Sequence, residues 1–155
     1  MEDWVTCISL EDNFKIEFPS RYSQEHMTYF PNSNPRRGTW IYKTSLIDFR
    51  QFLISVTHLE TYFGSEEDIL NAALDMLISD ARAKVLGRKN STKIAGLTSI
   101  EYKLQKLTHE TPVEIKGIVT ISGNIVYVLS MISPENEQKD YNSFINSFRI
   151  INQSL

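Results

Sequence analysis

The stretch EIKGIVTISGNIVYVLSMI, residues 114–132, decides the fold of this chain. It predicts two strands, Glu114–Ile121 and Ile125–Ile132, joined at Ser122-Gly123-Asn124, because Gly and Asn tolerate the positive φ angles of tight hairpin turns. The first strand alternates in polarity, whereas the second is apolar on both faces. A strand of the second kind needs cover on both faces, so we expect it in the middle of a sheet with other elements packed over each side.

Alternating patterns elsewhere predict further strands. The residues Arg21–Gly38 show no clear period and contain Pro31 and Pro35, so they are interpreted as a loop. Thr92–Ile94 is predicted to be a short edge strand. The other strands are predicted at Trp4–Leu10, Phe14–Phe18, Trp40–Thr44, Phe49–Leu59, Ile100–Gln105 and Arg149–Ile151, with Leu46–Asp48 as a connection.

Two helices are predicted. Ser65 is a good N-cap with Asp68 in the capping-box position, and the apolar stripe that follows predicts a helix of about 21 residues, roughly 30 Å long, that ends at Gly87. The second helix is expected to begin at Ser133-Pro134-Glu135, since Pro is favoured in a first turn. Its apolar face is Tyr141, Phe144, Ile145 and Phe148.

The order of these elements predicts the class α+β. Short turns between consecutive strands make the sheet mostly antiparallel. The long helix should cover one face and the shorter C-terminal helix the other, as in an α/β/α sandwich. A parallel sheet, or two helices on one face, would contradict this architecture.

The bulk composition fits a single domain over residues 1–155. The chain is 41% hydrophobic and 23% charged, as in ordinary globular proteins. Its net charge of −3 argues against nucleic acid as a partner, and no apolar run is long enough to span a membrane. With Cys7 as the single cysteine, no intrachain disulfide can form. Two locations stay open: cytoplasmic as the sequence is written, or exported if a leader has been removed.

Charge is unevenly distributed along the chain. Residues 60–80 contain six acidic residues and no Lys or Arg, whereas residues 82–110 contain seven basic and two acidic residues. These segments are interpreted either as solvated surfaces of opposite sign or as a dipole that steers a partner.

Four motifs follow one another along the chain: FKIEFP at 14–19, KIAGLTSIEYKL at 93–104, VTISGNIVYVLSM at 119–131 and YNSFINSFRI at 141–150. Their order resembles that of the PsbP-like superfamily, which includes the photosystem II extrinsic subunit, a Ran-binding nuclear-import factor and bacterial DcrB-like proteins. The resemblance implies a shared fold and, for most members, binding to another protein. No position here matches the metal ligands or Ran-contacting residues of those relatives, so it implies neither photosynthetic nor Ran-related function.

No motif for catalysis, phosphate binding or metal binding occurs in the sequence. His58 and Glu60 would share one face of a strand, but two ligands are too few for a zinc site. Cys7 has no basic neighbour in sequence to activate it, so packing is its default role. We therefore predict no cofactor, no metal and no enzymatic activity, with an enzyme whose site assembles from distant residues as an alternative.

The stretch Arg21–Tyr42, which extends from the predicted loop into the next strand, is rich in aromatic residues and arginine, and these are enriched at protein interfaces. Its candidate partner-binding residues are Tyr29, Arg36, Arg37 and Trp40. The other interpretation is that the aromatic residues pack at the edge of the core. The function predicted is a non-enzymatic protein-binding module.

A chaperone or adaptor for a secreted client protein is the main alternative. That role requires an exposed apolar patch, for which Phe52, Ile54 and Val56 are the candidates. A homodimer could bury the same patch, so the oligomeric state stays open.

Overall fold

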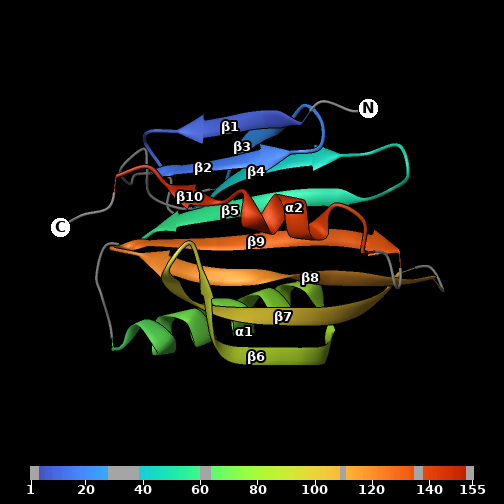
Figure 1. Cartoon of the computed structure of the whole chain (residues 1–155). Coiled ribbons are helices and arrows are strands. Elements are labelled where there is room, and N and C mark those ends of the chain that lie inside the picture. The colour runs from blue at the N-terminus through green and yellow to red at the C-terminus, as the bar shows by residue number, and fades with distance from the viewer. Residues whose placement is uncertain (1–3, 28–38, 60–63, 109–110, 135–137, 153–155) are drawn as a thin grey trace.

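The computed structural model describes residues 4–27, 39–59, 64–108, 111–134 and 138–152. These residues form two antiparallel sheets and two helices (Figure 1). The large sheet has seven strands in the order β3-β4-β5-β9-β8-β7-β6, and the small sheet has three in the order β1-β2-β10. The strands are β1 Val5–Ser9, β2 Phe14–Phe18, β3 Ser23–Met27, β4 Thr39–Ser45, β5 Gln51–His58, β6 Lys84–Ile94, β7 Leu97–Thr108, β8 Thr111–Ser122, β9 Ile125–Pro134 and β10 Arg149–Ile150.

The hairpin β8–β9 lies in the interior of the large sheet, as its sequence predicts. β9 pairs with β8 on one side and with β5 on the other. Gly123 takes a φ of 61° at the turn, which explains the glycine there. Tyr127 and Leu129 on one face of β9 are fully buried, and Val126 on the other face is 4% exposed. The expectation of a central strand covered on both faces is confirmed.

Helix α1, Glu66–Ala81, covers one face of the large sheet over β7 and β8. Ser65 caps it with the predicted capping box, because the Ser65 side chain accepts a hydrogen bond from the Asp68 backbone and the Asp68 side chain accepts one from the Ser65 backbone. Leu70 and Leu74 are its fully buried residues. The helix has 16 residues and does not reach Gly87, because Arg82 ends it in the left-handed conformation and the chain continues into β6.

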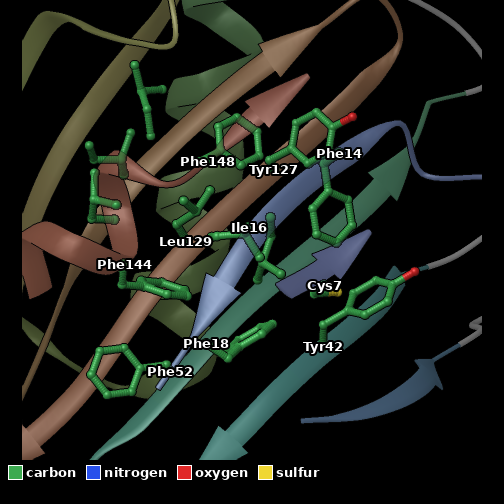
Figure 2. Close-up of a cluster of buried hydrophobic side chains, with 14 of the residues drawn as sticks. Cys7, Phe14, Ile16, Phe18, Tyr42, Phe52, Tyr127, Leu129, Phe144 and Phe148 are labelled. Carbon is green, nitrogen blue, oxygen red and sulfur yellow. The ribbon is translucent and has the colours of Figure 1, made fainter. Parts of the chain in front are cut away.

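The opposite face of the large sheet is covered by the small sheet and by α2, Tyr141–Asn146 (Figure 1). The α+β class and the placement of the helices on opposite faces are therefore confirmed. Figure 2 shows the core between these layers, in which aromatic rings of the small sheet, the large sheet and α2 pack against one another. Phe144 of α2 lies 5.2 Å from Phe52 and 5.6 Å from Phe18, measured between ring centroids.

Besides the end of α1, four sequence predictions are wrong at element boundaries. Residues 23–27 form strand β3 instead of loop, because they pair along β4 although they are almost entirely polar. The expected short strand Thr92–Ile94 is the end of the 11-residue strand β6. Pro134 ends β9 instead of beginning a helix, and α2 begins at Tyr141. Phe49 belongs to the turn before β5.

Candidate interaction surface

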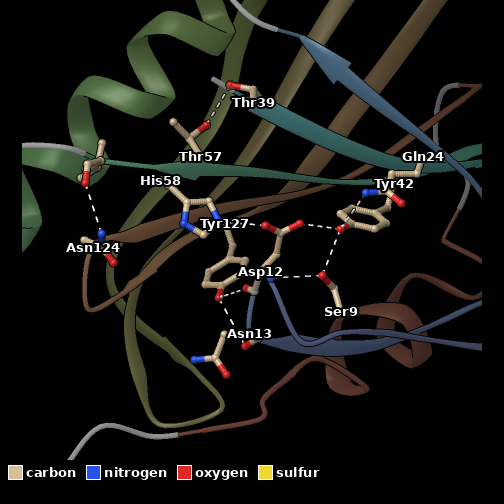
Figure 3. Close-up of polar contacts among 11 residues, drawn as sticks. Ser9, Asp12, Asn13, Gln24, Thr39, Tyr42, Thr57, His58, Asn124 and Tyr127 are labelled. Carbon is tan, nitrogen blue, oxygen red and sulfur yellow. Dashed lines mark hydrogen bonds and ion pairs between the residues drawn. The ribbon is translucent and has the colours of Figure 1, made fainter. Parts of the chain in front are cut away.

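A buried polar cluster joins the small sheet to the large one (Figure 3). Its centre is Asp12, in the β1–β2 turn, which has no exposed surface. One carboxylate oxygen of Asp12 lies 2.8 Å from His58 Nε2 of β5, and the other accepts a short hydrogen bond from the Tyr42 hydroxyl of β4. The Asp12 carbonyl oxygen accepts a 2.6 Å hydrogen bond from the Tyr127 hydroxyl of β9. Three strands of the large sheet thus hold one turn of the small sheet.

Burial determines the protonation of this region. It raises the pKa of the Tyr127 hydroxyl well above its usual value, with the nearby Asp12 carboxylate adding to the shift, so Tyr127 stays a hydrogen-bond donor. Burial also raises the pKa of the Cys7 thiol, which is fully buried as predicted. His58, which the sequence pairs with Glu60, contacts Asp12 instead, and Glu60 lies outside the described residues.

The cluster brings together an acid, an imidazole and hydroxyl groups, which sequence reasoning missed. However, the Asp12 side chain is completely enclosed, and only 19% of the His58 side chain is exposed. Its contacts in Figure 3 are internal to the two sheets. Within the described ranges, no group of three or more His, Cys, Asp or Glu residues could hold a metal ion. The arrangement fixes one sheet on the other.

Of the four predicted partner-binding residues, Tyr29, Arg36 and Arg37 lie outside the described residues. Trp40 is half-buried in β4 and packs against the core cluster. The side chains expected to form an exposed client-binding patch, Phe52, Ile54 and Val56, are fully buried under the small sheet and α2. That expectation is wrong, because the sequence does not reveal that β1, β2 and β10 form a second sheet over them.

The β4–β5 turn carries the most exposed large apolar side chains of the described residues. Ile47 is 100% exposed and Phe49 is 84% exposed. The turn is closed by a 2.8 Å hydrogen bond from the Leu46 amide to the Arg50 carbonyl oxygen and a 3.1 Å bond from the Phe49 amide to the Leu46 carbonyl oxygen. Sequence reasoning identified this turn as a connection, but the absence of Gly or Pro left its exposure unpredicted.

A hollow of about 590 Å³ lies beside this turn. It is formed where the β4–β5 turn meets the start of β1 and the end of β2, and these segments lie at one end of the molecule (Figure 1). Its lining residues are Val5, Pro19, Ser20, Arg21, Ser45, Leu46, Ile47, Asp48 and Arg50. We refer to residues 46–49 together with this hollow as the turn surface.

The two oppositely charged segments of the sequence meet in the structure. Arg88 of β6 donates to Asp75 of α1 at 3.1 Å, and its other nitrogen donates to Asn71. The pair is largely solvent-exposed, so it contributes little to stability. This contact supports solvated surfaces over a separated dipole.

No helix in the described part of the chain is long and apolar enough to cross a membrane. No protein-family model matches the chain, and no curated protein matches its sequence.

Solved structures give the clearest comparison. The solution structure of cyanobacterial PsbP (CyanoP) from Synechocystis sp. PCC 6803 matches 97% of this chain and 94% of its own, with a TM-score of 0.64 and 8% sequence identity. A crystal structure from Bacteroides thetaiotaomicron VPI-5482 matches 97% of this chain with a TM-score of 0.60 and 18% identity, and the chain spans 49% of that structure. At such low identity these likenesses concern the fold. The chain therefore has a PsbP-like fold.

Proposed function

We propose that this protein is a non-enzymatic module that binds another protein through the turn surface. The observation that carries the proposal is the pair Ile47 and Phe49, two large apolar side chains held almost entirely in water. Apolar side chains that gather on one protruding turn are typical of binding surfaces, since single scattered ones are normal. The pair lies next to a hollow that a partner side chain could fill.

The backbone at Phe49 supports this proposal. Phe49 has a φ of 69°, in the left-handed region that glycine and asparagine prefer. Holding a bulky residue there costs about 1–2 kcal/mol. Because the Phe49 side chain is 84% exposed, packing within the chain does not offset this cost. Strain of this kind is concentrated at functional sites.

Arg50 holds the turn rigidly. Its side chain is 5% exposed and donates to Asp48 at 2.9 Å, to the Lys139 carbonyl oxygen at 2.9 Å and to Asp140 at 3.0 Å. It also lies 5.7 Å from the centre of the Phe52 ring. The turn is thus tied to the segment that leads into α2. A preformed surface loses less conformational entropy on binding than a flexible one.

The pKa of Asp48 reflects the same contacts. Burial raises it, but the hydrogen bonds and charge of Arg50 together outweigh burial, so the pKa of Asp48 lies below its ordinary value. Since the folded pKa is lowered, the contribution of this ion pair is present above the ordinary pKa and is lost as the pH falls through the lowered value. The turn surface is therefore intact at neutral pH.

The test is affinity capture from the cells that make the protein. The wild-type chain should retain a polypeptide in stoichiometric amount, and the double variant Ile47→Ser, Phe49→Asn should lose it. Asparagine tolerates the left-handed conformation, so the turn keeps its shape. Met76→Ser is the matched control, because Met76 is a 62% exposed apolar residue of α1. Capture that is equal for the wild type and the double variant would refute the proposal, as would turnover of a small molecule without any partner.

A further inference from the structure

We infer that the partner contributes an extended, apolar segment that adds to the free edge of β1 as a fourth strand of the small sheet and ends in the hollow of the turn surface. This inference rests on the proposed function and specifies the chemistry of the partner. It begins from the position of β1, which pairs with β2 on one side and, among the described residues, has no strand on the other, so that it forms the outer edge of the small sheet (Figure 1).

The hydrogen-bonding register shows which groups of β1 face outward. Thr6 is opposite Glu17, and the Glu17 amide donates to Ser147 Oγ at 2.9 Å, on the side of β2 away from β1. Opposed residues in an antiparallel pair exchange either both hydrogen bonds or none, so Thr6 and Glu17 exchange none. The N–H and C=O groups of Thr6, and by alternation those of Ile8, therefore point to the free edge.

The outward N–H and C=O groups of Thr6 and Ile8 match the hydrogen-bonding pattern of an added strand. They form an alternating row of two donors and two acceptors, with which the backbone of another strand can pair. Cys7 lies between them and pairs with Ile16, so its backbone stays inside the sheet. An added strand would complete the outward groups without disturbing the existing ladder.

The other sheet edges carry the features that block strand addition, and β1 lacks them. β6 carries Lys84, Arg88, Lys89 and Lys93 and has two irregularities in its register. β3 carries Glu25, and β10 has two residues. β1 reads VTCIS, with no charged residue and no proline. Its apolar residue Ile8 is 58% exposed, and Leu10, directly after the strand, is 76% exposed.

Side chains near this edge specify an apolar occupant. Tyr22 forms a hydrogen bond with the Cys7 thiol and stacks on Phe18 at 5.3 Å between ring centroids. Trp4, the residue before β1, is also only partly buried against the core. Alternate side chains of the added strand would face these rings on the inner side and Ile8 on the outer side. We therefore expect apolar residues at both sets of positions.

The hollow favours a partner segment over a second copy of this chain. Val5 lines the hollow, so a strand that follows β1 toward its start arrives there. If a second copy paired antiparallel with this chain through β1, the C-terminal end of the second copy's β1 would lie beside the hollow. The chain turns back into β2 at residues 10–13, so the second copy could not extend into the hollow. A partner segment that continues beyond the paired residues can enter it.

The experiment uses a phage-displayed library of short random peptides selected on the whole chain. Enriched peptides should contain a run of apolar residues that covers both faces of the added strand, without proline. Their affinity, measured by fluorescence anisotropy, should fall about tenfold or more in Thr6→Pro, which removes one outward N–H and adds a ring at the edge. Ile8→Lys, which keeps the N–H, should weaken binding similarly. Val85→Lys is the matched control, because Val85 is a 44% exposed apolar residue of edge strand β6.

Amide hydrogen exchange provides a second readout. The amides of Thr6 and Ile8 should exchange rapidly in the free chain and become protected when an enriched peptide binds, whereas the Cys7 amide should be protected in both states. Equal affinity for Thr6→Pro and the wild type at unchanged melting temperature would overturn the inference. So would the absence of any enriched sequence, or a wild-type dimer that Thr6→Pro dissociates, since a second copy would then occupy the edge.

The two proposals can fail separately. If the partner captured through the turn surface is also retained by Thr6→Pro, strand addition is refuted and the binding function stands. If no partner is captured but library peptides protect Thr6 and Ile8, the edge accepts strands and the proposed function is refuted.

Discussion

The hydroxyl group of Tyr127 donates a 2.6 Å hydrogen bond to the backbone carbonyl oxygen of Asp12, which is 115 residues away in the sequence. Both residues are fully buried, and the bond connects the middle of the large sheet to the β1–β2 turn. It therefore holds together the layers that enclose the main core (Figures 2 and 3).

Tyr127→Phe should lower the free energy of unfolding by about 1–3 kcal/mol, because the Asp12 carbonyl oxygen loses its donor in a buried place. The measurement is urea denaturation followed by circular dichroism. Phe49→Tyr is the control: it also changes one ring by a single hydroxyl group, but at a side chain that is 84% exposed, so the free energy of unfolding should hardly change. A loss below about 0.5 kcal/mol would show that another donor replaces the hydroxyl.

Gly117→Ala should destabilise the chain by about 3 kcal/mol or more, since it combines overpacking with a disturbed buried hydrogen bond. An added Cβ would lie 1.7 Å from the Leu129 carbonyl oxygen and 2.7 Å from the Tyr102 hydroxyl, which donates to that oxygen at 2.9 Å. Thermal unfolding is the measurement.

The control for this glycine is Gly87→Ala. Gly87 lies in β6, and a Cβ added there would meet no described atom within 4 Å, so the melting temperature should hardly change. Similar effects of the two substitutions would mean that strand propensity, and not the contact with Leu129, decides the role of Gly117.

Phe49→Gly should raise the free energy of unfolding by up to about 1 kcal/mol, because glycine adopts the left-handed conformation without strain. Chemical denaturation of the wild type and the variant gives the difference. The same variant should bind the captured partner more weakly, so stability and binding would move in opposite directions. A destabilised variant would indicate that the Phe49 ring packs within the chain in solution.

The Cys7 thiol should resist modification by thiol reagents in the native chain. Burial excludes the reagent and raises the thiol pKa, and both effects lower the concentration of accessible thiolate. Stopped-flow labelling at rising denaturant should follow the opening of the small sheet. Rapid labelling at neutral pH without denaturant would show that β1 detaches from β2 far below global unfolding.

Much of the fold can be predicted because its signals are local. The hairpin β8–β9 and the cap of α1 depend on residues close together in sequence, such as Gly123 and Ser65. Strand β3 escapes prediction because its sequence, SQEHM, is polar and its conformation depends on pairing with β4. The end of α1 cannot be predicted either, because the residues after Arg82 suit a helix but pair with β7 as part of the edge strand β6.

The candidate sites depend on contacts that sequence patterns do not contain. Asp12, Tyr42, His58 and Tyr127 come from four separate segments, and the topology alone brings them together. The exposure of Ile47 and Phe49 is likewise a property of the turn conformation, since the same residues inside a strand would alternate between core and surface. The free edge of β1 can be recognised only once the second sheet is known.

The pairing of β2 with β10 has a consequence for how the chain folds. Asn13 donates a 2.9 Å hydrogen bond to the Asn152 carbonyl oxygen, 139 residues further along the chain. One edge of β5 likewise pairs only with β9, which is far downstream in the sequence. Closing such large loops is slow, since entropy is lost before the contacts form. During synthesis, therefore, β5 leaves the ribosome well before β9, which pairs with it, and before α2, which completes the cover of its apolar face. Until those segments are made, part of this face stays exposed to aggregation.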